Sequence, residues 1–217
     1  MGKNLMLADI LDVCCGPRMF YDRESKDRED TIYMDVRDNV DISYTHANGT
    51  VSEWHIRPDI VGDFRSIPFE DGRFSLVIFG PPHLARVTET GVIARKYGRL
   101  SKEWKRDLRE GFDECFRVLR PGGFLNFKWS EAEIPLAEVT PLFPQRPIYY
   151  QRQGLKGAWF MFRKEGGDTM RYGETPERRA DALERIARAL ERIADAEEER
   201  IRMAGEAQER LDRLDVM

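Results

Sequence analysis

The chain has 217 residues, which is enough for one well-packed domain and an additional segment but not for two full domains. Hydrophobic residues make up 41% and charged residues 34% of the sequence, and no apolar run approaches the roughly 20 residues of a membrane span. The net charge of −4 belongs to the C-terminal part, because residues 165–217 contain 15 acidic and 10 basic side chains. We therefore expect a globular cytoplasmic protein without membrane contact.

Four apolar or alternating segments precede the middle of the chain. Residues 7–14 predict a buried strand rather than a signal peptide, since this stretch contains acidic residues and lacks a small-residue cleavage site. Residues 31–36 predict a second strand, and residues 41–57 predict a hairpin with a type I′ turn at Asn48-Gly49. Residues 74–79 are apolar except for Ser75, as is typical of a central strand in a parallel sheet.

The next segments alternate between helix and strand. Residues 101–119 have apolar side chains at intervals of three and four, which predicts an amphipathic helix with Ser101 as its N-cap. Residues 124–129 predict a strand, and the runs 147–150 and 158–163 predict an antiparallel hairpin. The expected fold of residues 1–165 is thus α/β: a Rossmann-like sheet, mostly parallel, with a terminal antiparallel hairpin.

A charged tail follows this domain. Residues 166–175 are expected to form a linker, and residues 176–215 a long, charged amphipathic helix. Leu183, Ile186, Leu190 and Ile193 repeat at three and four residues, but the repeat slips after Ile193, which weakens a coiled-coil seam. The helix is expected to form a homodimer or to dock on a partner, with a solvated single helix as the alternative.

The three cysteines, Cys14, Cys15 and Cys115, are too few for a disulfide framework, and the adjacent pair lacks the spacing of a zinc site. We expect reduced thiols and no metal.

Two acidic residues at predicted strand ends indicate a cofactor site. Asp12 begins a loop that reaches Gly16, and Asp35 ends the second strand about twenty residues later. A loop with one glycine cannot place several backbone amides on a pyrophosphate, which argues against NAD or FAD. The loop suits a nucleoside with an amino-acid arm: Asp35 would accept from ribose hydroxyls, and Asp12, Cys14, Cys15 and Gly16 would hold the amino-acid end.

The sequence resembles the class I S-adenosylmethionine-dependent methyltransferases over about residues 10–164. The resemblance rests on LDVCCG, YMDVR, GDFRSIPFEDGRFSLVIF and LRPGGFLNFKW, which occur in the order found in that family. It implies S-adenosylmethionine as cofactor and places Asp63 and Phe64 against the adenine. The segments DVCCGPRMF and PPHL are also similar to those of small methyltransferases of bacteriophages and prophages.

The tetrapeptide Gly80-Pro81-Pro82-His83 occupies the place of the D-P-P-Y motif of amino-methyltransferases, so these four residues are the expected catalytic segment. In that motif an acid and a proline carbonyl align the target amine, and an aromatic ring stacks on a flipped base. Here Gly80 has no side chain to accept a hydrogen bond, and His83 replaces the ring. An imidazole can stack or act as a base near neutral pH.

Basic residues follow this segment. Residues 84–109 contain eight basic and three acidic side chains, and such a patch suits a nucleic acid. Charge runs are also commonly solvated faces. The expected substrate-binding residues are Arg95, Lys96, Tyr97, Lys128 and Trp129, with packing as the alternative for Trp129.

Three functions follow from these patterns. The favoured one is methyl transfer to a nucleic-acid or nucleobase amine. A second is methyl transfer to a small molecule or a protein, with His83 as general base. A third, favoured by Gly80, is a non-catalytic scaffold that keeps the cofactor fold and assembles through the C-terminal helix.

Overall fold

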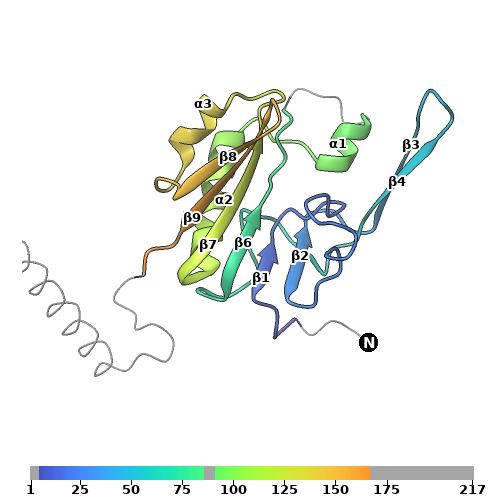
Figure 1. The fold of residues 1–217 in the computed structure, drawn as a ribbon. Helices are drawn as coiled ribbons and strands as arrows, with labels where there is room; N and C mark the ends of the chain where they lie inside the picture. Colours follow the sequence, from blue (N-terminus) through green and yellow to red (C-terminus); the bar gives the residue numbers. More distant parts are fainter. Residues whose placement is uncertain (1–4, 86–90, 167–217) are drawn as a thin grey trace, which may run out of the picture. The chain divides into compact units, whose positions relative to one another are not determined.

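The computed structural model of the protein describes residues 5–85 and 91–166, and Figure 1 shows their fold. The main sheet has seven strands in the order β5-β2-β1-β6-β7-β9-β8. Their bounds in that order are Ile60–Val61, Thr31–Asp35, Ile10–Asp12, Phe74–Phe79, Leu119–Ser130, Gly157–Arg163 and Tyr149–Gln153. The first five strands pair in parallel, and β9 pairs antiparallel with both β7 and β8. A mostly parallel α/β sheet with an antiparallel edge is confirmed, and the predicted linker and C-terminal helix lie outside the described residues.

One face of this sheet is covered by helix α2 (Trp104–Val118). Its side chain Phe112 is buried, and the ring lies 5.5 Å from that of Phe79 on β6 and 4.9 Å from that of Phe127 on β7. The short helix α3 (Leu136–Val139) is followed by the 3-10 turn η1 (Thr140–Leu142), which contacts α2. The main core therefore lies between α2 and the strands behind it.

The opposite face of β1 and β2 is covered by a loop. Residues 13–30 form turns, and residues 5–85 contain no helix. The guanidinium of Arg18 lies 3.8 Å from the centre of the Tyr33 ring and donates hydrogen bonds to the carbonyls of Lys26 and Arg57. This cation holds the loop on the sheet in place of the helix that commonly follows the first strand of such a fold.

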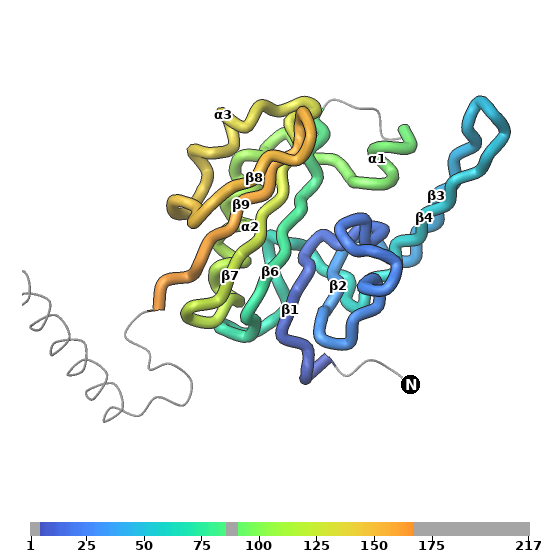
Figure 2. Tube along the Cα trace, in the orientation of Figure 1, coloured from blue at the N-terminus to red at the C-terminus, as the bar shows by residue number. Residues whose placement is uncertain are grey.

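A two-stranded hairpin extends away from the main sheet, as Figure 2 shows, and is formed by β3 (Val40–Thr45) and β4 (Val51–Ile56). Its turn is not the predicted type I′. The backbone N–H of Gly49 donates to the carbonyl of His46, and Gly49 has a φ of 81° whereas Asn48 is not in the left-handed region. This pattern is typical of a type I turn followed by a glycine bulge, because type I′ requires two successive positive φ angles.

Helix α1 (Val92–Tyr97) lies beside this hairpin and was not predicted. The Lys96 ammonium lies 4.2 Å from the centre of the Trp54 ring, and Arg95 donates to the carbonyl of Asp41. Because both contacts join α1 to the hairpin, no local sequence pattern could reveal them.

Several predicted boundaries differ from the observed ones; β8, for example, is Tyr149–Gln153 and was predicted at 147–150. Strand β1 contains only three residues, because residues 5–7 before it form a turn. Helix α2 has Glu103 as its N-cap; Ser101 instead accepts from the backbone N–H of Glu103 and donates to Asp107. Strand β7 begins at Leu119, earlier than the predicted start at residue 124.

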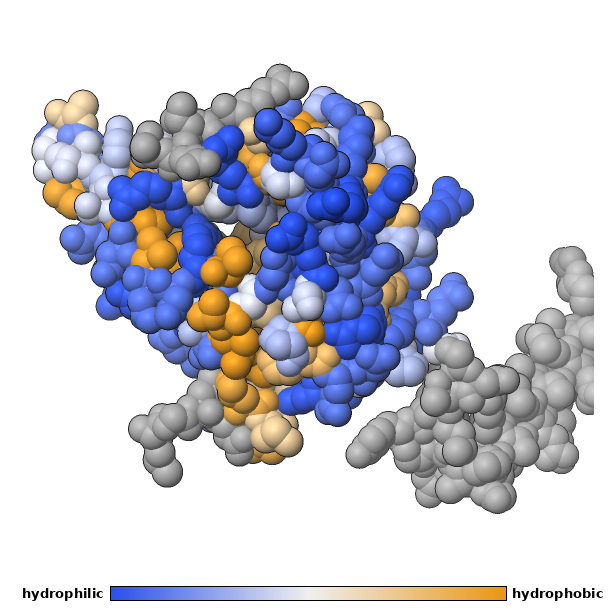
Figure 3. All heavy atoms as spheres, turned by 180° about the vertical axis from the view of Figure 1, so that it is seen from behind, coloured by the Kyte–Doolittle hydropathy of each residue, from blue (hydrophilic) through white to orange (hydrophobic). Residues whose placement is uncertain are grey.

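Within residues 5–85 and 91–166, no helix is long and apolar enough to cross a membrane. Figure 3 shows the molecule from behind, where hydrophobic residues interrupt a mostly hydrophilic surface.

Candidate functional site

The loop after β1 crosses the carboxyl ends of three strands. The backbone N–H of Val13 donates to the carbonyl of Ile78 on β6, and that of Cys15 donates to the carbonyl of Met34 on β2. Gly16 has a φ of 50° and donates its N–H to the buried carboxylate of Asp35 at 2.9 Å. The loop and the Asp35 carboxylate thus form one rigid unit at the edge where parallel sheets bind their ligands.

The Asp35 carboxylate is fully engaged by neighbouring groups. Its Oδ1 accepts from the backbone N–H of Arg37 at 3.0 Å and from Arg37 Nε at 2.8 Å. Its Oδ2 accepts from Gly16 N–H and from Arg37 Nη2 at 3.0 Å. A carboxylate offers about four acceptor positions, so a ribose hydroxyl can reach Asp35 only by displacing the Arg37 guanidinium.

Asp12 lies at the end of β1 and is completely buried. It accepts hydrogen bonds from the Cys14 backbone N–H at 3.3 Å and from the Tyr21 hydroxyl at 3.1 Å. Burial raises the pKa of Asp12 to about 7, and these two bonds oppose that change only in part. Asp12 therefore shapes the loop from inside and does not face a pocket.

A first pocket of about 200 Å³, here called the Asp35 pocket, opens above β2. It is lined by Val13, Cys14, Asp35, Val36, Arg37, Gly62, Phe64, Pro82, Tyr97, Gly98 and Arg99. Of the two predicted adenine residues, Phe64 lines this pocket, whereas the Asp63 carboxylate binds Arg65 at 2.6 Å. The lining of this pocket thus combines an aromatic ring, Phe64, with a buried acid, Asp35.

A second pocket of about 280 Å³, here called the Lys128 pocket, adjoins the first. Its lining includes Gly80, Pro81 and His83 after β6, together with Cys14, Cys15, Gly16, Pro17, Met19, Phe20, Arg37, Lys96, Tyr97, Lys128, Ser130, Gln153 and Gly157. Cys14, Arg37 and Tyr97 line both pockets, so the two pockets are neighbours that share these three residues.

Phe20 fills the position where a side chain at residue 80 would lie. A Cβ atom added to Gly80 would be 2.5 Å from two carbons of the Phe20 ring, which is well inside contact distance. The Phe20 ring also meets the Trp159 ring edge-on, with their centres 5.0 Å apart. Gly80 is thus a packing requirement of this site, and the acid of the D-P-P-Y motif has no space here.

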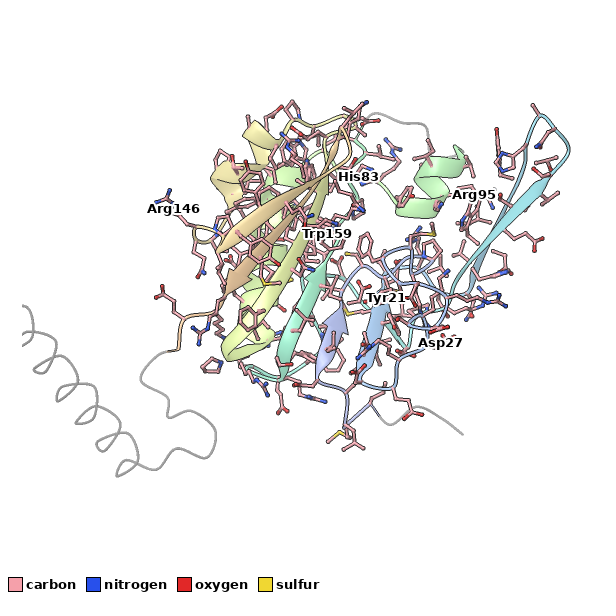
Figure 4. All side chains as sticks on the ribbon, viewed as in Figure 1. Tyr21, Asp27, His83, Arg95, Arg146 and Trp159 are labelled. Atoms are coloured by element: carbon pink, nitrogen blue, oxygen red, sulfur yellow. The ribbon has the colours of Figure 1, made fainter. Side chains whose placement is uncertain are left out.

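His83 and Lys128 both line the Lys128 pocket. In Figure 4, His83 lies between the ends of the strands and α1, and Trp159 lies on β9. Burial lowers the pKa of His83, and the Lys128 ammonium lowers it further, while Glu133 opposes this. Since its ordinary value is 6.5, the His83 imidazole is neutral at pH 7 and can accept a proton.

The predicted substrate residues separate into two groups. Lys96, Tyr97 and Lys128 line the Lys128 pocket, whereas Arg95 does not, because its side chain is bound to the hairpin. Trp129 packs in the core instead: it is 1% exposed, and its indole N–H donates to the carbonyl of Ile134. Neighbouring residues of a strand point to opposite faces, so Lys128 and Trp129 cannot line the same pocket.

Some basic residues of segment 84–109 pair with acids, whereas others line a pocket. On α2, Lys105 pairs with Glu138, and Arg106 pairs with Glu110. Lys105 and Arg106 line neither pocket, whereas Lys96 lines the Lys128 pocket and Arg99 lines the Asp35 pocket.

Several residues of the site were not predicted from the sequence, and Arg37 and Phe20 are the two with the most contacts described above. A basic residue two positions after a strand-ending acid was a usable signal for Arg37. Phe20 had no such signal, because its role depends on packing against Gly80.

Cys14 is partly buried, and Cys15 and Cys115 are buried; all three are free thiols. Burial raises the pKa of each thiol, so none is an activated nucleophile. In the described part of the chain, no cluster of three or more His, Cys, Asp or Glu side chains has the arrangement of a metal site.

No family model and no curated protein matches this sequence. Solved structures match distantly. A SAM-dependent methyltransferase from Methanosarcina mazei is 12% identical, with 76% of this chain and 96% of that chain covered and a TM-score of 0.40. The N-methyltransferase NodS from Bradyrhizobium japonicum is 14% identical, with 73% and 86% covered and a TM-score of 0.42. TTHA0409 from Thermus thermophilus, in complex with S-adenosyl-L-methionine, is 18% identical, with 55% and 59% covered and a TM-score of 0.33.

Proposed function

We propose that the protein is an S-adenosylmethionine-dependent methyltransferase that acts on an amine of a nucleic acid or nucleobase. The observation that carries this proposal is the junction of the two pockets at Cys14, Arg37 and Tyr97. A donor in the Asp35 pocket and an acceptor in the Lys128 pocket would meet at this junction. The sequence motifs that resemble class I methyltransferases border the same two spaces.

The residues present suit the cofactor. The Asp35 carboxylate would accept from the ribose, Phe64 would contact the adenine, and the backbone of Cys14 to Gly16 would hold the amino-acid end. When bound, the cofactor supplies an electrophilic methyl group on a sulfonium. The protein's own contribution is to position the acceptor and to exclude water.

The acceptor side lacks a carboxylate at residue 80, so alignment of an amine falls to the backbone around Pro81 and to His83. Pro81 is buried and lines the Lys128 pocket. His83 is neutral at pH 7, which lets it accept the proton that an amine loses when it is methylated. The same neutral imidazole favours a second candidate, in which His83 acts as general base on a small-molecule acceptor.

Calorimetric titration with S-adenosylmethionine tests the cofactor. We expect Asp35→Asn to weaken S-adenosylmethionine binding at least about tenfold. The amide keeps one acceptor oxygen and replaces the other with an NH₂ donor, so it cannot accept from two ribose hydroxyls. Asp38→Asn is the matched control, since Asp38 is exposed. Circular dichroism checks that each variant is folded.

Transfer of a radiolabelled methyl group to DNA, RNA, nucleosides and small amines then tests the acceptor. Label on a nucleic acid or nucleoside supports the favoured acceptor, and label only on small amines supports the second candidate. Absence of S-adenosylmethionine binding would refute both.

A further inference from the structure

The Lys128 pocket is basic. Three cationic side chains line it, Arg37, Lys96 and Lys128, and its lining in the described part of the chain includes no Asp or Glu. The charge of Arg37 is balanced by Asp35, with the two side chains 2.8 Å apart. Lys96 and Lys128 therefore supply the uncompensated positive charge of this space.

The Lys128 ammonium is held in place by aromatic rings. Lys128 is opposite Trp159 in the β7–β9 register, so both side chains lie on the face away from α2. Its Nζ atom is 4.7 Å from the centre of the Phe20 ring and 5.2 Å from that of Trp159. Such contacts fix the position of a cation without neutralising its charge.

No acid compensates this charge. Among residues 5–85 and 91–166, no carboxylate lies within ion-pair distance of Lys128 Nζ. The side chain is half-buried, and burial lowers the pKa of Lys128. A half-buried cation without a counterion is more stable when an anion binds to it, because the anion replaces the hydration that burial removed.

Neutral hydrogen-bonding groups lie at the same end of β7. Ser130 and Gln153 line the pocket beside Lys128. The Gln153 carbonyl oxygen accepts from the Trp159 indole N–H at 3.0 Å, which directs the amide and leaves its NH₂ group as a donor. A hydroxyl, an amide and an ammonium are a suitable donor set for a phosphate or carboxylate oxygen.

We propose that the Lys128 pocket recognises an anionic group, a phosphate or a carboxylate, on the molecule that is methylated. Lys128 is the main partner of this anion, and Lys96 adds charge at the α1 side. The description of the ligand as a methyl acceptor rests on the proposed function, whereas the anion site itself does not. Acceptors that carry a negative charge are thus selected over their neutral counterparts.

Titration with inorganic phosphate and with acetate, at constant ionic strength, tests the site directly. Binding is followed by NMR at the Trp159 indole N–H, whose ring contacts Lys128, and at the His83 ring, whose pKa Lys128 influences. We expect saturable shifts in the wild type and at least about tenfold weaker binding in Lys128→Met, the loss typical of one charge-assisted contact. Lys128→Arg keeps the charge and should retain binding.

Lys156→Met is the matched control, because Lys156 is exposed and does not line the pocket. Saturation by phosphate alone identifies a phosphate-bearing acceptor, and saturation by acetate alone a carboxylate-bearing one. Absence of saturation with both anions, or equal binding by Lys128→Met, would overturn the proposal.

Calorimetry with S-adenosylmethionine on the same samples separates the two proposals. Anion binding without cofactor binding would refute the methyltransferase and leave the anion site standing. Cofactor binding without anion binding would refute the anion site and leave the proposed methyltransferase function standing.

Discussion

The guanidinium of Arg37 lies against the carboxylate of Asp35 and donates to both of its oxygens. It therefore occupies the acceptor positions that a ribose hydroxyl would need. A further Arg37 nitrogen donates to the carbonyl of Arg95 on α1 at 2.7 Å. One side chain thus joins the buried acid Asp35 to helix α1, whose Tyr97 lines both pockets. Ligand binding at Asp35 must break the first contact and thereby loosens the second.

Replacement of Arg37 by alanine tests this competition. We expect Arg37→Ala to tighten adenosine binding by about tenfold, because the ribose no longer displaces a guanidinium. The same change should lower the free energy of unfolding by roughly 3 kcal/mol. It leaves the buried Asp35 carboxylate with two donors, the backbone N–H groups of Gly16 and residue 37. Calorimetry and urea denaturation measure the two effects.

Arg57→Ala is the control for this experiment, because Arg57 also pairs with an acid, Asp41, but in an exposed position. Neither binding nor stability should change much, as exposed ion pairs contribute little. Weaker adenosine binding by Arg37→Ala would show that the guanidinium contacts the ligand instead of competing with it.

Gly80 is expected to tolerate no side chain. Gly80→Ala places a methyl group on the Phe20 ring and should cost about 1–3 kcal/mol of unfolding free energy, as is usual for overpacking. Gly166→Ala is the control, because a Cβ there has its nearest neighbour at 3.9 Å. Urea denaturation compares both variants with the wild type.

A second substitution identifies the cause of this loss. The double variant Gly80→Ala, Phe20→Leu should lose less stability than the sum of its single variants, since a smaller side chain gives the new methyl group space. Additive losses would show that Phe20 is not the obstacle.

The sequence predicted the elements whose signals are local. Strand β6 was predicted with its observed bounds, because a six-residue run that is apolar except for Ser75 ends at Gly80-Pro81. Asp35 was placed at the end of β2 for the same reason, a buried strand that stops at an acid. The roles of Arg37 and Phe20 were not predictable in this way, because they depend on contacts between segments far apart in the chain. Trp129 could have been assigned to the core from alternation alone.

The pKa of His83 is expected to depend on the charge of Lys128. We expect its pKa to lie below the ordinary 6.5 and to rise in Lys128→Met, where the repulsion between the imidazolium and the ammonium is removed. Burial remains in this variant, so the pKa should return only in part. An NMR titration of the imidazole protons measures it, with Lys156→Met as control. An unchanged midpoint in Lys128→Met would mean that the two groups do not interact in solution.

Asp12 should make the protein less stable as the pH rises. Its pKa is about 7 in the folded state and near 3.8 when unfolded, so between these values the folded state binds more protons. The free energy of unfolding therefore falls from about pH 4 to pH 7, by roughly 4 kcal/mol for this group alone at 1.36 kcal/mol per pKa unit.

Asp12→Asn removes this titration and keeps the shape of the side chain. Its amide oxygen can still accept from the Cys14 backbone N–H, and its NH₂ group can donate to the Tyr21 hydroxyl, whose own proton then points elsewhere. We expect the variant to be more stable than the wild type at pH 8 and similar to it at pH 4, as measured by urea denaturation. Asp38→Asn, at an exposed position, should follow the wild type at both values. If Asp12→Asn showed the same decline with pH as the wild type, the Asp12 carboxyl would already be ionised in the acid range, and its burial would have to be compensated by the positive charge of Arg18.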